Sequence, residues 1–136
     1  MPDVKVFLGR KATERDWRRL WKELPPVVAE EMSCDYWGPP GPPGFERVWQ
    51  RLQLDPEANI DLMVFADVDG ATATEFGLKS TADVIIEVTA YAYPGRVRNL
   101  EERLTNIATA AKKVLGENLR ASITFVPIKE GNWFAI

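Results

Sequence analysis

Proline is the second residue of the chain, directly after the initiator methionine, in the stretch MPDVKVFLGRK. Two roles are open to a proline at this position. Because it has a fixed φ and no backbone N–H, it can simply begin a strand at a sheet edge. If Met1 is removed, however, Pro2 carries a free secondary amine, which is a base that needs no histidine. The sequence therefore raises the hypothesis of catalysis by the N-terminal amine.

The remaining reactive residues exclude several familiar kinds of catalysis. The 136 residues contain no histidine and a single cysteine, Cys34. Serine–histidine and cysteine–histidine nucleophile systems and ordinary zinc sites are thereby ruled out. Neither G-x-x-x-x-G-K-[ST] nor G-x-G-x-x-G occurs, so a phosphate-binding loop has no support. A proton-transfer group must be a carboxylate, a lysine, a tyrosine, Cys34 or the terminal amine, and no metal or organic cofactor is implied.

Length and charge predict one soluble domain without a nucleic-acid or membrane surface. A chain of 136 residues is the size of a single domain, here 1–136. The net charge of −3 gives no sign of a nucleic-acid surface, and no apolar run approaches the length of a membrane span. A lone cysteine cannot form an internal disulfide, so we expect a cytoplasmic protein.

The residues that follow Pro2 predict a strand and then a helix. Residues 3–9 alternate apolar and polar side chains, as a half-buried strand does. Thr13 is expected to cap a helix that continues to about Met32. Pro25-Pro26 is expected to kink or restart this helix.

The middle of the chain contains an insert and a second strand. The insert, residues 34–59, includes GPPGPPG, which predicts a stiff polyproline loop, and a short amphipathic helix at 45–52. Residues 60–68 predict the second strand, with a turn at 69–70.

The second half predicts strand, helix and strand again. Residues 82–92 form the strongest strand pattern in the chain, and a helix is expected from about Arg98 to Leu115, ended by Gly116. Residues 121–128 predict the last strand.

The two halves share a local pattern. Gly9-Arg10 and Gly95-Arg96 each stand between a strand and a helix, 86 residues apart. We interpret this as a diverged internal duplication. The fold class is therefore predicted to be α+β, with two tandem β-α-β units at about 2–70 and 82–136.

These features together resemble the tautomerase superfamily, whose members contain two β-α-β units as separate chains or fused into one. The matching stretches are MPDVKVFLGR, YPGRVRNLEERL and ITFVPIKEGNWFAI, the last of which is similar to the C-terminus of 4-oxalocrotonate tautomerase-like chains. The second unit resembles that of fused members such as cis-3-chloroacrylic acid dehalogenase. The resemblance covers residues 2–32 and 60–136 and leaves the insert unmatched.

The resemblance implies a catalytic set made of Pro2, Arg96 and Arg98. An apolar pocket lowers the pKa of an α-amino group from its usual value of about 8, so that neutral Pro2 can take a proton from a carbon beside a carbonyl. The arginines would hold the carboxylate of a small 2-oxo or unsaturated acid and stabilise the enolate.

Four further residues are implied as substrate-binding. Arg10 occupies the equivalent junction in the first unit and can face a neighbouring site. Tyr93 stands where some relatives have a second arginine, and Trp133 and Phe134 are candidates for the apolar wall. Glu130 is a candidate for activating water, although its place in an exposed turn is the simpler explanation.

Three functions remain open. The first is a cofactor-independent tautomerase, which can extend to hydration or dehalogenation and is expected to form a homotrimer. The second is a non-catalytic oligomeric binding module of the same fold with Met1 retained. The third is a ferredoxin-like dimer that binds or cyclises an apolar ligand. Unpaired strand edges favour an oligomer in all three.

Overall fold

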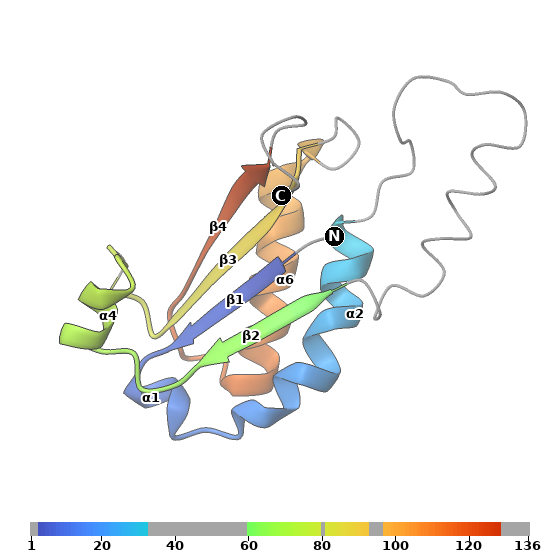
Figure 1. Ribbon diagram of the computed structural model, residues 1–136. Coiled ribbons are helices and arrows are strands. Elements are labelled where there is room, and N and C mark those ends of the chain that lie inside the picture. The colour runs from blue at the N-terminus through green and yellow to red at the C-terminus, as the bar shows by residue number, and fades with distance from the viewer. Residues whose placement is uncertain (1–2, 33–59, 80, 93–96, 129–136) are drawn as a thin grey trace, which may run out of the picture.

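A computed structural model describes residues 3–32, 60–79, 81–92 and 97–128 (Figure 1). In chain order the elements are β1 (Asp3–Leu8), α1 (Arg10–Thr13), a 3₁₀ turn η1 (Trp17–Arg19), α2 (Leu20–Met32), β2 (Asp61–Phe65), α4 (Ala71–Glu75), β3 (Val84–Tyr91), α6 (Leu100–Leu115) and β4 (Ala121–Ile128). Within these residues no helix is long and apolar enough to cross a membrane.

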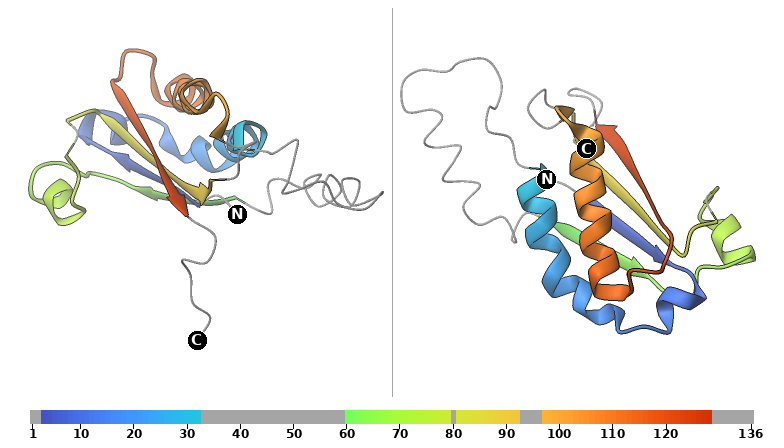
Figure 2. Two further views of the ribbon diagram at one scale, coloured as in Figure 1. Left: turned by 90° about the horizontal axis from the view of Figure 1, so that it is seen from above. Right: turned by 180° about the vertical axis from the view of Figure 1, so that it is seen from behind.

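The four strands form one sheet in the order β2-β1-β3-β4. β1 is parallel to β2 and β3 is parallel to β4, whereas β1 and β3 are antiparallel at the centre of the sheet. Each parallel pair is joined by a helical crossover, and Figure 2 shows α2 and α6 on the same face of the sheet. The predicted α+β class with two tandem β-α-β units is confirmed.

This strand order is incompatible with the ferredoxin-like alternative. In a ferredoxin-like split β-α-β unit, another strand lies between the two strands that the helix connects. Here β1 and β2 are direct hydrogen-bonded neighbours, and so are β3 and β4. The hypothesis of a ferredoxin-like dimer is therefore wrong.

The main core lies between the sheet and the two long helices. Alternation along β1 sends Val4, Val6 and Leu8 into this layer, and all three are fully buried. The other buried members come from β3, α2, α6 and their ends: Ala12, Leu20, Leu24, Val28, Met32, Val84, Ile86, Val88, Ile107, Ala111, Leu115 and Leu119. The sheet face opposite to the helices bears Lys5 directly across from Glu87, together with exposed Met63 on one edge strand and exposed Val126 on the other.

The start of the first crossover differs from the prediction. Thr13 is the last residue of α1, and its hydroxyl contacts the Leu8 and Gly9 carbonyls instead of capping a following helix. α2 is continuous through Pro25 and Pro26, so the predicted restart there is wrong. Proline has a helical φ, but it lacks an N–H and its ring crowds the carbonyl four residues earlier. Buried side chains on this helix compensate for that cost.

A short helix between the two units was not predicted. α4 begins after Gly70, whose φ is +54°. Phe76, directly after α4, packs with Phe7 and Phe65 at ring-centroid distances of 5.1 and 4.9 Å. The connection between β2 and β3 thus contributes to a second, smaller apolar cluster at the end of β1.

The predicted strands at 82–92 and 121–128 and the helix ending at Gly116 are confirmed within a few residues. The insert at 34–59, with its predicted loop and short helix at 45–52, lies outside the described residues.

Candidate functional site

The start of β1 and the ends of β3 and β4 lie at the same end of the sheet. Asp3, at the start of β1, pairs with Thr89 near the end of β3. The backbone N–H of Ala92 donates to the carbonyl of Ile128, so the ends of β3 and β4 lie together. Figure 1 shows the start of α6 and the end of α2 at this same end. The start of β1, the ends of β3 and β4, the start of α6 and the end of α2 therefore lie at one end of the molecule.

Arg98 is the predicted catalytic residue that lies among the described residues. It is exposed, in the turn that leads into α6. The next residue, Asn99, has a left-handed backbone with φ of +52° and ψ of +40°. Asparagine is among the few non-glycine residues that accept this conformation readily. The turn therefore redirects the chain immediately after Arg98 and lets α6 begin at Leu100.

The carbonyl of Arg98 is held by a side chain from the first turns of α6. Arg103 Nε donates to it at 2.7 Å, and Arg103 Nη1 donates to the carbonyl of Glu31 at the end of α2. Asn106 Nδ2 donates to Glu31 Oε1 at 3.1 Å. No local sequence pattern predicts this cluster, because Arg103 and Glu31 are 72 residues apart.

Arg10 lies at the other end of the sheet. It follows Gly9 after the last residue of β1, and at about 3.3 Å per residue the six-residue strand separates Asp3 from Leu8 by roughly 16 Å. The backbone N–H of Arg10 donates to Asp69 Oδ2 at 2.9 Å. Within one chain, the structure does not bring Arg10 and Arg98 together.

The other predicted site residues lie outside the described residues. They are Pro2, Tyr93, Arg96, Glu130, Trp133 and Phe134. Their nearest described neighbours in the sequence are Asp3, Ala92, Val97 and Ile128, all at the end of the sheet that also holds Arg98.

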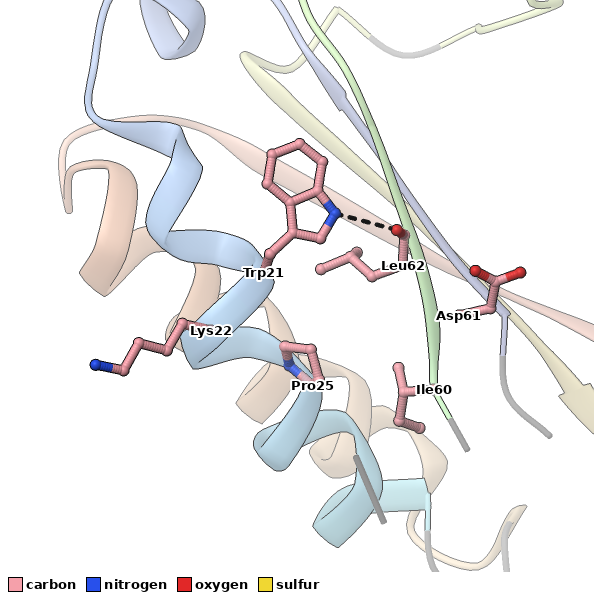
Figure 3. A pocket seen from close by; sticks show the side chains of 6 residues that line it. All are labelled: Trp21, Lys22, Pro25, Ile60, Asp61 and Leu62. Atoms are coloured by element: carbon pink, nitrogen blue, oxygen red, sulfur yellow. Dashed lines mark hydrogen bonds between the residues drawn. The ribbon is translucent and has the colours of Figure 1, made fainter. Parts of the chain in front are cut away.

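An open hollow of about 580 Å³ lies between α2 and the edge strand β2 (Figure 3). It is lined by Trp21, Lys22, Pro25, Ile60, Asp61 and Leu62. The indole N–H of Trp21 donates to the carbonyl of Leu62 at 3.2 Å, which occupies one acceptor of this edge strand. In Figure 3 the Lys22 and Asp61 side chains point away from the space between helix and strand. The hollow's exposed lining is nevertheless more polar than apolar.

Comparison with known proteins supports the fold and not a particular activity. No family model matches the chain, and no curated protein matches it. Among solved structures, it is similar to a macrophage migration inhibitory factor-like protein from Entamoeba histolytica, with 15% identity and a TM-score of 0.50, over 99% of this chain and 95% of that one. It is also similar to a 5-carboxymethyl-2-hydroxymuconate delta-isomerase, with 14% identity and a TM-score of 0.45, over 100% and 87% of the two chains.

The macrophage migration inhibitory factor-like protein is a member of the tautomerase superfamily. Together with the paired β-α-β units, this likeness shows that the chain has the tautomerase-superfamily fold. The resemblance inferred from its N-terminal, central and C-terminal motifs is thus confirmed at the level of the fold.

Proposed function

We propose that the protein is a tautomerase-like enzyme that uses the N-terminal amine of Pro2 on a small 2-oxo or unsaturated carboxylic acid. The observation that carries this proposal is the shared location of the start of β1 and the Arg98 turn at one end of the sheet. Enolisation of an acid requires a base and a cation, and Pro2 directly precedes β1 in the sequence.

The proposed reaction moves one proton and needs no cofactor. The neutral amine of Pro2 takes a proton from the carbon beside the substrate's keto group, and the C–H electrons form the enolate. Arg98, with Arg96, binds the carboxylate and stabilises the enolate charge. The protonated amine then returns its proton to the enolate oxygen or to carbon. Tyr93, Trp133 and Phe134 are proposed to border the substrate.

Arg10 fits this proposal only as a contribution to another subunit's site. It lies at the opposite end of β1 from the start of the chain, so it cannot join Arg98 within one chain. We propose a homotrimer in which Arg10 approaches a neighbouring chain. The uncovered sheet face, with exposed Met63 and Val126 on its two edge strands, is the surface proposed for that assembly.

The test begins with the intact mass of protein expressed without an N-terminal tag. A mass lower by one methionine is expected, and it means that Pro2 carries a free amine. Exchange at C3 of pyruvate is then followed in D₂O by the loss of the methyl ¹H signal. The protein is expected to accelerate this exchange above the rate in buffer.

The control is a variant with Gly-Ser added in front of Pro2, which turns the amine into an amide nitrogen without basicity. Exchange is expected to fall by about a hundredfold or more, with the circular dichroism spectrum unchanged. Retention of Met1, or equal exchange in both proteins, would overturn the proposal. Either result would instead favour the non-catalytic binding module.

A further inference from the structure

Arg103 joins three parts of the molecule at the end of the sheet that holds the proposed site. It stands in the first turns of α6, and its guanidinium bonds the Arg98 carbonyl and the Glu31 carbonyl at the same time. A guanidinium is planar and rigid, so two carbonyls bonded to it are held in a fixed relation. The turn before α6 is thereby tied to the last turn of α2.

The turn that Arg103 holds is one that needs support. Asn99 is left-handed, and its side chain makes no hydrogen bond that caps α6. An ordinary helix start is fixed by such a side-chain cap. Here the Arg98 carbonyl, directly before the left-handed residue, is fixed by Arg103 Nε at 2.7 Å.

The other end of this link is firmly anchored. The Glu31 carbonyl belongs to the last turn of α2, where the negative end of the helix dipole favours a cation. Glu31 is also held by its carboxylate, which accepts a hydrogen bond from Asn106 on α6. α2 is itself packed on the sheet by buried Val28 and Met32. Arg103 therefore links the backbone of Arg98 to a helix that is packed on the core of the domain.

We propose that Arg103 is a positioning residue, which aims Arg98 at the substrate carboxylate without touching the substrate. This inference rests on the proposed function. It adds Arg103 to the proposed catalytic set of Pro2, Arg96 and Arg98, and it predicts that Arg103 acts on substrate binding only through Arg98.

A double-mutant cycle with pyruvate exchange as the assay tests this. Arg103→Ala is expected to raise KM by between about tenfold and a hundredfold, as misplacement of a binding group does, with a smaller change in kcat. In the Arg98→Ala background the same substitution is expected to change KM less than twofold, because the two effects are not independent. Equal effects in both backgrounds would overturn the proposal.

Two variants separate positioning from charge and from general stability. Arg103→Lys keeps the charge but has a single Nζ, which cannot bond both carbonyls in the same geometry, so KM is expected to stay raised. Arg120→Ala is the matched control, because Arg120 Nη2 also donates to a backbone carbonyl, that of Thr81, at the opposite end of the sheet. Its KM is expected to equal that of the wild type. A KM restored by lysine, or raised equally in Arg120→Ala, would overturn the proposal.

Binding of pyruvate to ¹⁵N-arginine-labelled protein decides the matter if the wild type shows no exchange activity. The Arg98 Nε resonance is expected to shift with pyruvate in the wild type and to shift much less in Arg103→Ala. Equal shifts in the two proteins, or no shift in the wild type, would overturn the role of Arg103. Failure of the proposed enzyme and failure of the positioning residue are therefore distinguished.

Discussion

The carboxylate of Asp69 lies in the space that a side chain on residue 9 would need. A Cβ added to Gly9 would be 2.8 Å from Asp69 Oδ1 and 3.3 Å from the carbonyl of Asp83. The same carboxylate accepts the backbone N–H of Arg10 at 2.9 Å, at the start of α1. The first Gly-Arg motif therefore has a structural reason for its glycine, which is independent of any role of the arginine in binding.

Gly9→Ala is expected to destabilise the protein by about 1–3 kcal/mol, as overpacking does. The cause is steric, because Gly9 has an extended backbone with φ of −68° and ψ of 170° that any residue can adopt. Urea unfolding followed by circular dichroism measures the change. In the Asp69→Ala background the cost of Gly9→Ala is expected to shrink, since the nearest obstructing atom is then removed. An equal cost in both backgrounds would contradict the assigned contact.

Thr13→Val is expected to destabilise the fold by about 0.5–1.5 kcal/mol, the net contribution of a typical hydrogen bond, because it removes the hydroxyl's bonds to Asp67 and Leu8. The Thr13 hydroxyl accepts the backbone N–H of Asp67 at 2.9 Å and lies 3.2 Å from the Leu8 carbonyl. It thus joins the first crossover to the residues after β2. Thr13→Ser keeps the hydroxyl and is expected to lose much less. Equal losses by thermal unfolding in the two variants would show that the methyl group matters and the hydrogen bonds do not.

Val126→Lys tests the proposed assembly. Val126 is 40% exposed on edge strand β4, on the sheet face that α2 and α6 leave uncovered. If that face is covered by neighbouring chains, a buried lysine charge there is expected to dissociate the trimer. Light scattering is expected to change from the mass of three chains to that of one. Thr109→Lys, at an exposed position of α6 on the helical side of the sheet, is the control and is expected to remain trimeric. A wild type that is already monomeric would contradict the trimer.

The sequence predicted the strands and α6 well because their signals are local. Alternation in residues 3–9 and 82–92 and the helical period up to Leu115 depend on neighbours within a few residues. The four-stranded order then follows from two adjacent β-α-β units. The sequence pattern could not place α4, because a five-residue helix is too short to show the helical period. The segment is also held by packing of Phe76 on Phe7, which is distant in the sequence.

The errors around the first helix have a similar origin. Thr13 was expected to use its hydroxyl on the following residues, as a helix cap does, but its partners are the end of β1 and the residue Asp67. Pro25 and Pro26 were expected to restart the helix, and packing of α2 against the sheet outweighed that preference. At the candidate site, Arg98 was found from a motif, whereas Arg103 was missed because both of its partners are defined only by the fold.

Each β-α-β unit forms its own parallel strand pair, so the chain could be divided into two halves. Among the described residues, each parallel strand pair lies within one half of the chain, and one antiparallel pairing of six residue pairs, from Asp3–Thr89 to Leu8–Val84, joins the halves within the sheet. Contacts between α2 and α6 reinforce that seam on the helical face. A backbone break between residues 79 and 81 would interrupt neither parallel pair. Two separately produced halves would then associate through the β1–β3 pairing and the α2–α6 contact. The stability of the complex would depend on the concentration of the halves.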